Sequence, residues 1–435
     1  MLKVLHLSDI HMGSGFSHGR INPATGLNTR LEDFMQTLSR CIDRALAEPV
    51  DLVLFGGDAF PDATPPPYVQ QAFASQFRRL ADAHIPTVLL VGNHDQHSQG
   101  QGGASLCIYR TLGVPGFIVG DRLETHTIQT RQGPVQVITI PWLTRSTLLT
   151  RPDAEGLSMA DVNQLLGDRL RVALEGEIRR LDPTVPTVLL AHAMVDTAAY
   201  GAERFLAVGK GFTIPLALLT RDCFDYVALG HVHRHQVLCD APPVVYPGSI
   251  ERVDFSEEKE AKGYVLVDLA KGHANIEFCP LPVRPFRTIE VDVTTATEPQ
   301  ALILAALAPD HIRDAVVRLI YHVRPQQLDE IDAIALQSAL AIAHSYSIQP
   351  NLVSQLTRTR LPDWDVGAQL DPLQVLQTYL ANRSDLQDIE AEILAAAQTL
   401  LTNELYVMAS NAEVEAELAT AIAQAEAPET QLRLL

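Results

Sequence analysis

The first 233 residues of this chain repeat one pattern five times: a short apolar segment that ends in residues able to bind a metal ion. Each segment has five or six residues, which is a usual length for a buried strand. Two stretches with the spacing of an amphipathic helix, 30–47 and 68–83, separate the first three segments. A βαβαβ order implies parallel strands with helices on their faces, and the carboxyl ends of such strands meet at one edge of a sheet. The polar ends should therefore lie together.

The residues at these ends are carboxylates, imidazoles and one amide. In chain order, the segments and their polar residues are 2–7 with Asp9 and His11, 51–55 with Asp58, 87–91 with Asn93, 187–191 with His192, and 225–229 with His231 and His233. Such oxygen and nitrogen donors favour Mn or Fe in a two-metal site, and Zn also fits. Two cations about 3.5–4 Å apart clamp a phosphate and activate a water. We therefore predict a two-metal phosphoesterase with these seven ligands, in which Asp58 is the bridging carboxylate.

Packing alone explains this pattern poorly. A lone Asp-x-His is common by chance, and the histidine pair at the fifth segment can also be two exposed loop residues. The stretch Gly92–Asp95 is harder to explain in this way, because its four small or polar residues directly follow five apolar ones. All five motifs, each at the end of a strand, favour a site. His6, in contrast, lies inside the first strand and is interpreted as a packed core histidine.

The rest of the sequence predicts an α/β fold in which two sheets pack face to face with helices outside. A hairpin at 125–130 and 135–140 and a helix at 159–181 continue the first domain, and an antiparallel pair at 263–268 and 274–279 closes it. The Pro-rich stretch that follows marks a boundary.

A smaller α+β unit and a helical C-terminal segment follow that boundary. The small unit has its strands and helices in the order 287–293, 297–307, 315–323, 325–343 and 346–354. The last part begins with a linker at 361–367 and is rich in Ala, Leu and Glu from residue 371. The predicted domains are therefore a core at 1–282, a small α+β domain at 283–358, and a linker with a helical tail at 359–435.

Composition points to a reducing compartment. The five cysteines are scattered without CxxC spacing, so they suggest neither a zinc knuckle nor a disulfide framework. No stretch has the roughly 18 apolar residues of a membrane span, and no signal-peptide pattern opens the chain, so we expect a cytoplasmic protein without a membrane partner. The net charge of −19 is unusual for a nucleic-acid binder. However, 21 of the 52 acidic residues and only 8 of the 33 basic ones lie at 286–435, so charge neither supports nor excludes a DNA substrate.

The ordered string D-x-H, GD, GNHD, H and GHxH, which covers residues 4–233, resembles the calcineurin-like metallophosphoesterase superfamily. The resemblance implies a two-sheet metallophosphoesterase sandwich flanked by helices. It also implies that one metal is bound by Asp9, His11, Asp58 and His233, and the other by Asp58, Asn93, His192 and His231. His94 would be the non-ligand histidine that protonates the leaving oxygen or stabilises the transition state. Asp95 would orient His94 through a hydrogen bond.

Further stretches resemble SbcD-type nucleases, the bacterial counterparts of the archaeal and eukaryotic meiotic-recombination nuclease. They are HLSDIHMG at 6–13, GDAF at 57–60 with PPPY at 65–68, and YPGSIERVDF at 246–255 with KGY at 262–264. The resemblance implies a Mn²⁺-dependent DNA nuclease, with 3′→5′ exonuclease activity on double-stranded ends and endonuclease activity on single strands or hairpins. It further implies end processing in DNA repair, an SMC-like ATPase partner of the SbcC type, and a homodimer.

The two downstream regions also fit that family. The small α+β domain would be a capping domain that limits which DNA enters the site. The helical tail would pack on the coiled-coil base of the ATPase, although a simple helical bundle explains its periodicity equally well. One departure is Pro61, which stands where the archaeal and eukaryotic branch has a second active-site histidine. His94 is therefore expected to carry proton transfer alone.

Two other functions remain open at this point. A phosphatase or cyclic phosphodiesterase acting on a small substrate would use the same metal site, but the cap-like domain and the YPGSIERVDF stretch argue against it. A largely non-catalytic scaffold of the ATPase complex is the second alternative, and the complete ligand set argues against that one.

Overall fold

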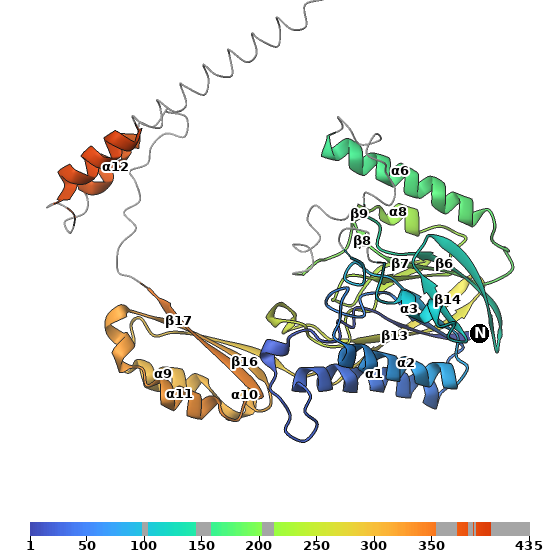
Figure 1. Ribbon diagram of the computed structural model, residues 1–435, viewed down its shortest axis with the longest axis horizontal. Coiled ribbons are helices and arrows are strands. Elements are labelled where there is room, and N and C mark those ends of the chain that lie inside the picture. Colours follow the sequence, from blue (N-terminus) through green and yellow to red (C-terminus); the bar gives the residue numbers. More distant parts are fainter. Residues whose placement is uncertain are drawn as a thin grey trace, which may run out of the picture. The chain divides into compact units, whose positions relative to one another are not determined.

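Two six-stranded sheets lie face to face in the computed structural model, which describes residues 1–97, 103–144, 158–201, 213–353, 372–381, 386 and 389–401 (Figure 1). The first sheet has the order β14 (His273–Pro280), β13 (Gly263–Ala270), β1 (Leu2–Leu7), β2 (Leu52–Phe55), β3 (Thr87–Leu90) and β4 (Phe117–Gly120). The second has the order β11 (Gln236–Asp240), β12 (Pro243–Tyr246), β10 (Tyr226–Gly230), β7 (Thr187–His192), β6 (Gly133–Ile140) and β5 (Glu124–Thr130). The predicted two-sheet α/β architecture is confirmed.

Strand alternation divides the apolar side chains between three layers of core. On β1, Leu5 and Leu7 face outward and pack with helices α1 (Thr29–Ala47) and α2 (Pro67–Asp82). Val4 of the same strand faces the second sheet and joins the core between the sheets. Because successive side chains of a strand point to opposite faces, one apolar run can supply two core layers.

Helix α6 (Met159–Ile178) covers the outer face of the second sheet together with the short α8 (Leu216–Leu219). Its start is fixed by a capping box, in which Ser158 and Asp161 bond each other's backbone amides. The remaining short elements of this part are η1 (Phe16–His18), α3 (Cys107–Thr111), the pair β8 (Met194–Val195) and β9 (Thr213–Ile214), and η2 (Phe255–Glu257). The sandwich therefore has helices on both of its outer faces, as predicted.

A three-stranded parallel sheet follows, which we call the cap sheet: β15 (Phe286–Asp292), β16 (Val316–Val323) and β17 (Ser345–Leu352), with β16 in the middle. Its helices are α9 (Pro299–Ala306), α10 (Pro309–Ile312), η3 (Pro325–Glu330) and α11 (Ala333–Leu340). They cover one face of the sheet and enclose a separate apolar cluster. The single helix predicted at 325–343 is wrong. Asp332 accepts hydrogen bonds from the amides of Ile334 and Ala335, and so starts a new helix after η3.

The cap sheet is attached to the sandwich by polar contacts. Arg284 forms a bidentate pair with Asp33 of α1, with both N–O distances 2.6 Å. The Thr29 hydroxyl lies 2.8 Å from His344 Nε2, and the Ser345 hydroxyl donates to the His18 carbonyl. The predicted domain boundary between 282 and 283 falls in the loop that separates β14 from β15 and stays a prediction.

The chain divides into two compact units, Met1–Leu352 and Val353–Leu435. The described part of the second unit is helical at α12 (Pro372–Ala381) and at 390–401. The predicted linker at 361–367 lies outside the described residues, as does the tail after residue 401. None of the helices in the described ranges is long and apolar enough to cross a membrane.

Candidate metal centre

The five polar strand ends meet at one edge of the sandwich. β1, β2 and β3 are parallel neighbours in the first sheet, and β7 and β10 are parallel neighbours in the second. Four of the residues that follow these strands adopt a left-handed backbone conformation, with φ of 52° at Asp9, 47° at His11, 58° at Asp58 and 106° at His231. Residues other than glycine rarely adopt it, and such strain is concentrated at functional sites.

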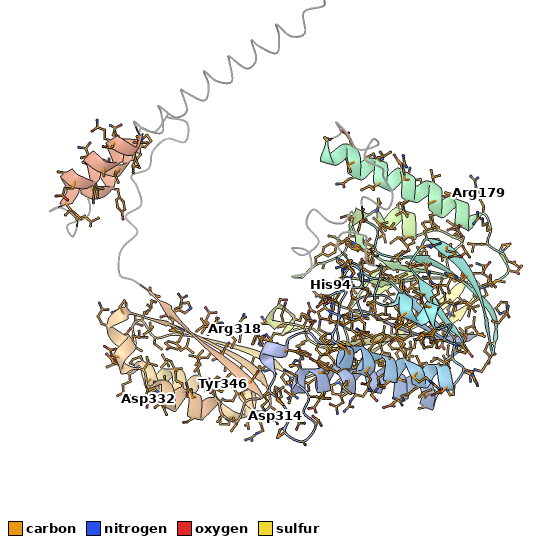
Figure 2. All side chains as sticks on the ribbon, in the orientation of Figure 1. His94, Arg179, Asp314, Arg318, Asp332 and Tyr346 are labelled. Carbon is orange, nitrogen blue, oxygen red and sulfur yellow. The ribbon has the colours of Figure 1, made fainter. Side chains whose placement is uncertain are left out.

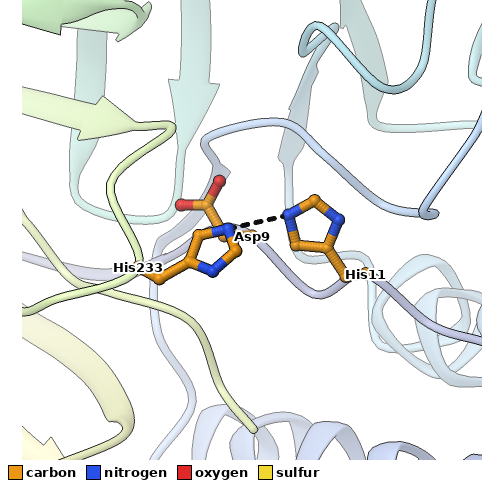
Figure 3. Close-up of side chains that lie close together, drawn as sticks. All are labelled: Asp9, His11 and His233. Carbon is orange, nitrogen blue, oxygen red and sulfur yellow. Dashed lines mark hydrogen bonds between the residues drawn. The ribbon is translucent and has the colours of Figure 1, made fainter. Parts of the chain in front are cut away.

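Asp9, His11 and His233 form a first group, which we call group A (Figure 3). One potential ligand atom from each lies within 4.8 Å of the others, and all three side chains are buried or nearly so. The Nε2 atoms of His11 and His233 are 3.0 Å apart and point toward each other. His233 Nδ1 lies 2.6 Å from a carboxylate oxygen of Glu257, which can only accept, so His233 donates there and turns its Nε2 lone pair to the group.

Asp58, His192 and His231 form a second group, which we call group B, with Asn93 between the two histidines. Asn93 Oδ1 lies 2.9 Å from His192 Nε2 and 2.9 Å from His231 Nδ1. His192 Nδ1 lies 2.7 Å from the Gly56 carbonyl and must donate to it. In the neutral ring, the Nε2 lone pair then faces the oxygens of Asn93 and Asp58, all of them acceptors. Only a positive charge between these atoms resolves this meeting of lone pairs, either a second proton on His192 or a metal ion, and the donor set fits a metal ion.

Asp58 lies between the two groups. Its Oδ2 is 3.6 Å from His11 Nε2 in group A and 3.4 Å from His192 Nε2 in group B. Its Oδ1 accepts from the amide of His94 at 2.9 Å, which fixes the carboxylate. A carboxylate that faces both groups is placed to bridge two cations.

The charges of these groups are set by burial and by their neighbours. Burial lowers the pKa of His11 and of His231 well below the ordinary value. Burial also opposes protonation of His192 and His233, but Asp58 beside the first and Glu257 beside the second outweigh it and raise each pKa to about 9. Without a cation, both histidines are therefore positively charged at neutral pH and carry a second ring proton. A metal ion that binds Nε2 has to displace that proton.

The expected hydrogen bond between Asp95 and His94 is not found among the described contacts, so that prediction is wrong. The Asp95 carboxylate instead accepts from the backbone amides of Asp58 at 2.9 Å, Ala59 at 3.1 Å and Gly92 at 2.9 Å. Three amides converge on it because the turns after β2 and β3 pack against each other there. Asp95 therefore holds the turn that carries Asp58.

His94 is oriented by a backbone carbonyl. Its Nδ1 lies 2.7 Å from the carbonyl oxygen of Pro61, to which it must donate. A ring nitrogen of His94 lies within 4.8 Å of ligand atoms of His11 and Asp58, near the edge of the sandwich (Figure 2). Pro61 thus takes part in the site through its main chain.

Sequence reasoning missed two side chains at the site. Glu257 contacts His233 from 24 residues further along the chain. The indole of Trp142 packs on the His231 ring, with centroids 4.8 Å apart and planes at 32°, and it touches the edge of His192. Arg30 is fully buried and pairs with Asp33, so it is a structural residue. His6 is a buried core residue, as predicted.

Comparison with known proteins agrees with this geometry. The model of the family described as calcineurin-like phosphoesterase matches residues 2–235. The DNA double-strand break repair protein Mre11 of Aeropyrum pernix is 27% identical over 310 residues, which is 67% of this chain and 64% of that protein. The match therefore spans less than two thirds of that relative's length.

Two solved structures are more remote. A dimetal phosphatase from Danio rerio aligns with 64% of this chain and 99% of its own at 10% identity, with a TM-score of 0.35. The purple acid phosphatase PPD1 from yellow lupin seeds aligns with 64% and 51% at 13% identity, with a TM-score of 0.37. The family match covers more than half of the chain and every residue of groups A and B, and this chain therefore belongs to the calcineurin-like phosphoesterase family.

Proposed function

We propose that this protein is a metal-dependent DNA nuclease of the SbcD type, which hydrolyses phosphodiester bonds in DNA repair and end processing. The observation that carries the proposal is the extent of the likeness to Mre11. That match covers 67% of the chain, whereas the family match ends at residue 235, just past half of it. The likeness to a DNA repair protein therefore continues beyond the residues that the family model covers.

In this proposal, Asp9, His11, Asp58 and His233 hold one divalent cation, and Asp58, Asn93, His192 and His231 hold the other. When bound, the two cations would neutralise the charge of the phosphate and activate a water molecule. We expect Mn²⁺, because the ligands combine imidazole nitrogens with carboxylate oxygens.

The chain's own contribution to bond cleavage is His94. The Pro61 carbonyl orients the ring through Nδ1. In the imidazolium form, which carries a proton on both nitrogens, His94 gives its Nε2 proton to the leaving oxygen of the phosphodiester and becomes neutral, with the remaining proton on Nδ1. No hydrogen bond to Asp95 is needed for that orientation. Asp95 acts one step earlier, by keeping the Asp58 turn in place.

The finer features of the proposal follow the nuclease family. They are 3′→5′ exonuclease activity on double-stranded ends, endonuclease activity on single strands or hairpins, an SMC-like ATPase partner of the SbcC type, and a homodimer. The α+β domain at 283–358 would cap the site, and the tail at 359–435 would bind the ATPase.

Cleavage of end-labelled linear DNA tests the proposal. The full chain is assayed with Mn²⁺, Mg²⁺ and Zn²⁺ in turn, with and without the ATPase and ATP. We expect Mn²⁺-dependent loss of label from double-stranded ends. Hydrolysis of p-nitrophenyl phosphate with no cleavage of any DNA would favour a small-substrate phosphatase or cyclic phosphodiesterase. A biological role that survives Asp58→Asn would favour a scaffold.

His94→Gln separates proton transfer from metal binding. We expect two bound Mn²⁺ ions per chain, as in the wild type, with turnover lower by about 10²–10⁴-fold. Metal content is measured by elemental analysis of the protein used in the assay. His273→Gln, which changes an exposed histidine at the start of β14, serves as the control. If the metal content of His94→Gln fell with its activity, His94 would be a ligand.

A further inference from the structure

Glu257 is a buried carboxylate at the end of η2, with 5% of its surface exposed. One of its oxygens lies 2.6 Å from His233 Nδ1. A carboxylate only accepts, so the contact fixes the His233 tautomer with the proton on Nδ1. It also fixes the plane of the ring, and with it the direction of the Nε2 lone pair toward Asp9 and His11.

The other Glu257 oxygen is held as firmly. It lies 2.7 Å from Lys262 Nζ and accepts from the Val253 amide at 3.0 Å. Lys262 is itself buried, and its ammonium also donates to the His233 carbonyl at 3.0 Å. Side chain and main chain of His233 are thus tied into one closed ring through Glu257 and Lys262. A second carboxylate, Glu260, lies 2.7 Å from the same ammonium without reaching His233.

The other histidines of the site have weaker support. His192 and His94 donate to neutral carbonyls, those of Gly56 and Pro61. His231 Nε2 is buried and has no hydrogen-bond partner among the described residues. An anion behind an imidazole raises its strength as a ligand more than a carbonyl does. Group A therefore has a reinforcement that group B lacks in the described structure.

We propose that Glu257 and Lys262 are positioning residues for the metal ion at group A, and that they make this ion the more tightly held of the two. The inference rests on the proposed metal centre and adds to it the origin of an unequal affinity. It also gives a role to two buried charged residues that follow the last histidine motif, Glu257 and Lys262, which are not ligands themselves.

A purely structural role is the alternative to be excluded. The residues on either side of Glu257 hold the cap sheet: the Phe255 ring lies 4.4 Å from the guanidinium carbon of Arg318, and Glu258 accepts from the Thr288 amide at 3.0 Å. Figure 2 shows Arg318 on the cap-sheet face opposite α9 and α11. Loss of that attachment would lower stability without singling out one metal ion.

Calorimetric titration of the metal-free full chain with Mn²⁺ distinguishes the two roles. The wild type should bind two ions with different affinities. Glu257→Gln keeps the shape of the side chain and removes its charge, so the tighter site should weaken by about 10–100-fold while the other stays within about threefold. Lys262→Gln should weaken the same site by less. Glu260→Gln is the matched control, because it also removes a partner of Lys262, and its titration should match the wild type.

Electron paramagnetic resonance gives a second readout. At two equivalents of Mn²⁺ the wild type should show a spin-coupled pair, and Glu257→Gln at the same concentrations should show a larger uncoupled Mn²⁺ signal. Unchanged titrations for both Glu257→Gln and Lys262→Gln would overturn the proposal, as would equal losses in Glu257→Gln and Glu260→Gln. If the wild type bound no Mn²⁺ at all, the metal centre itself would be refuted instead.

Discussion

His6 should make this protein sensitive to acid, and the size of the effect follows from its contacts. The residue lies in β1 of the first sheet, fully buried against β10 of the second. Its Nε2 lies 3.1 Å from the Leu229 carbonyl and must donate to it, and its Nδ1 lies 2.8 Å from the Tyr226 hydroxyl, which can then donate back. The neutral ring is therefore fully satisfied, and burial lowers the pKa of His6 from 6.5 to about 3.

The sign and the magnitude follow from proton linkage. Between about pH 6.5 and pH 3 the unfolded chain binds a proton at His6 that the folded chain does not, so stability falls as the pH falls. The slope is about 1.4 kcal/mol per pH unit, which amounts to about 2.5 kcal/mol between about pH 7 and pH 4.5. That loss is a large share of the 5–15 kcal/mol typical of folded domains, roughly a quarter.

Urea unfolding of wild type and His6→Met, followed by circular dichroism in the presence of a chelator, measures this term. The variant should be less stable by about 1–3 kcal/mol near neutral pH, because the Tyr226 hydroxyl loses its partner. That difference should shrink by about 2.5 kcal/mol at about pH 4.5, since the variant has no charge to bury. His273→Met, at an exposed position, should track the wild type at every pH. A gap between wild type and His6→Met that stays constant with pH would refute the reasoning.

Two further substitutions test the packing at the metal centre and the attachment of the cap sheet. In Gly57→Ala the new methyl group would lie 2.6 Å from His192 Nδ1 at a φ of +100°, so we expect Mn²⁺ affinity to fall at least about tenfold. Gly26→Ala, with φ +73° and open space around it, should leave the affinity unchanged, and equal losses in both variants would show that backbone strain alone is responsible. Arg284→Ala removes the bidentate pair with Asp33 and should lower the free energy of unfolding by about 1–3 kcal/mol. An unchanged urea midpoint would mean that the cap sheet is held by its other contacts.

Much of this site could be predicted because strand ends leave a strong signal. An apolar run that stops at a polar residue marks where a buried strand reaches an edge, and seven such residues converge in the structure. Asp58 was expected between two groups and lies there. The hairpin, the helix of the second sheet and the closing strand pair could be predicted for a different reason: the spacing of their apolar residues is a local signal. Strand β4 (Phe117–Gly120) was missed, although it is as long as β2 and β3, because it directly follows a Gly- and Pro-containing stretch at 113–116 that is typical of a loop.

The hydrogen bonds behind the ligands could not be predicted in the same way. Pro61 and Gly56 act through carbonyl oxygens, which every residue has, so their identity carries no signal. Glu257 is brought to His233 by the fold of the intervening chain, and nothing in its spacing points to a histidine. Asp95 was assigned to its sequence neighbour, whereas in the structure it bonds the backbone of a different strand end. Contacts set by tertiary packing are the part that a pattern in one sequence does not encode.

The left-handed backbone at Asp9, His11, Asp58 and His231 lowers the stability of the folded chain in order to place side chains of the site. Each of these conformations costs on the order of 1 kcal/mol relative to glycine, and together they take a noticeable part of a marginal stability. Glycine at any one of them would relax the turn and delete a side chain of the centre. A laboratory selection for thermal stability alone should therefore favour glycine at these positions and yield proteins that are more stable but lack the metal centre. Engineering for robustness has to begin elsewhere, with these turns held fixed.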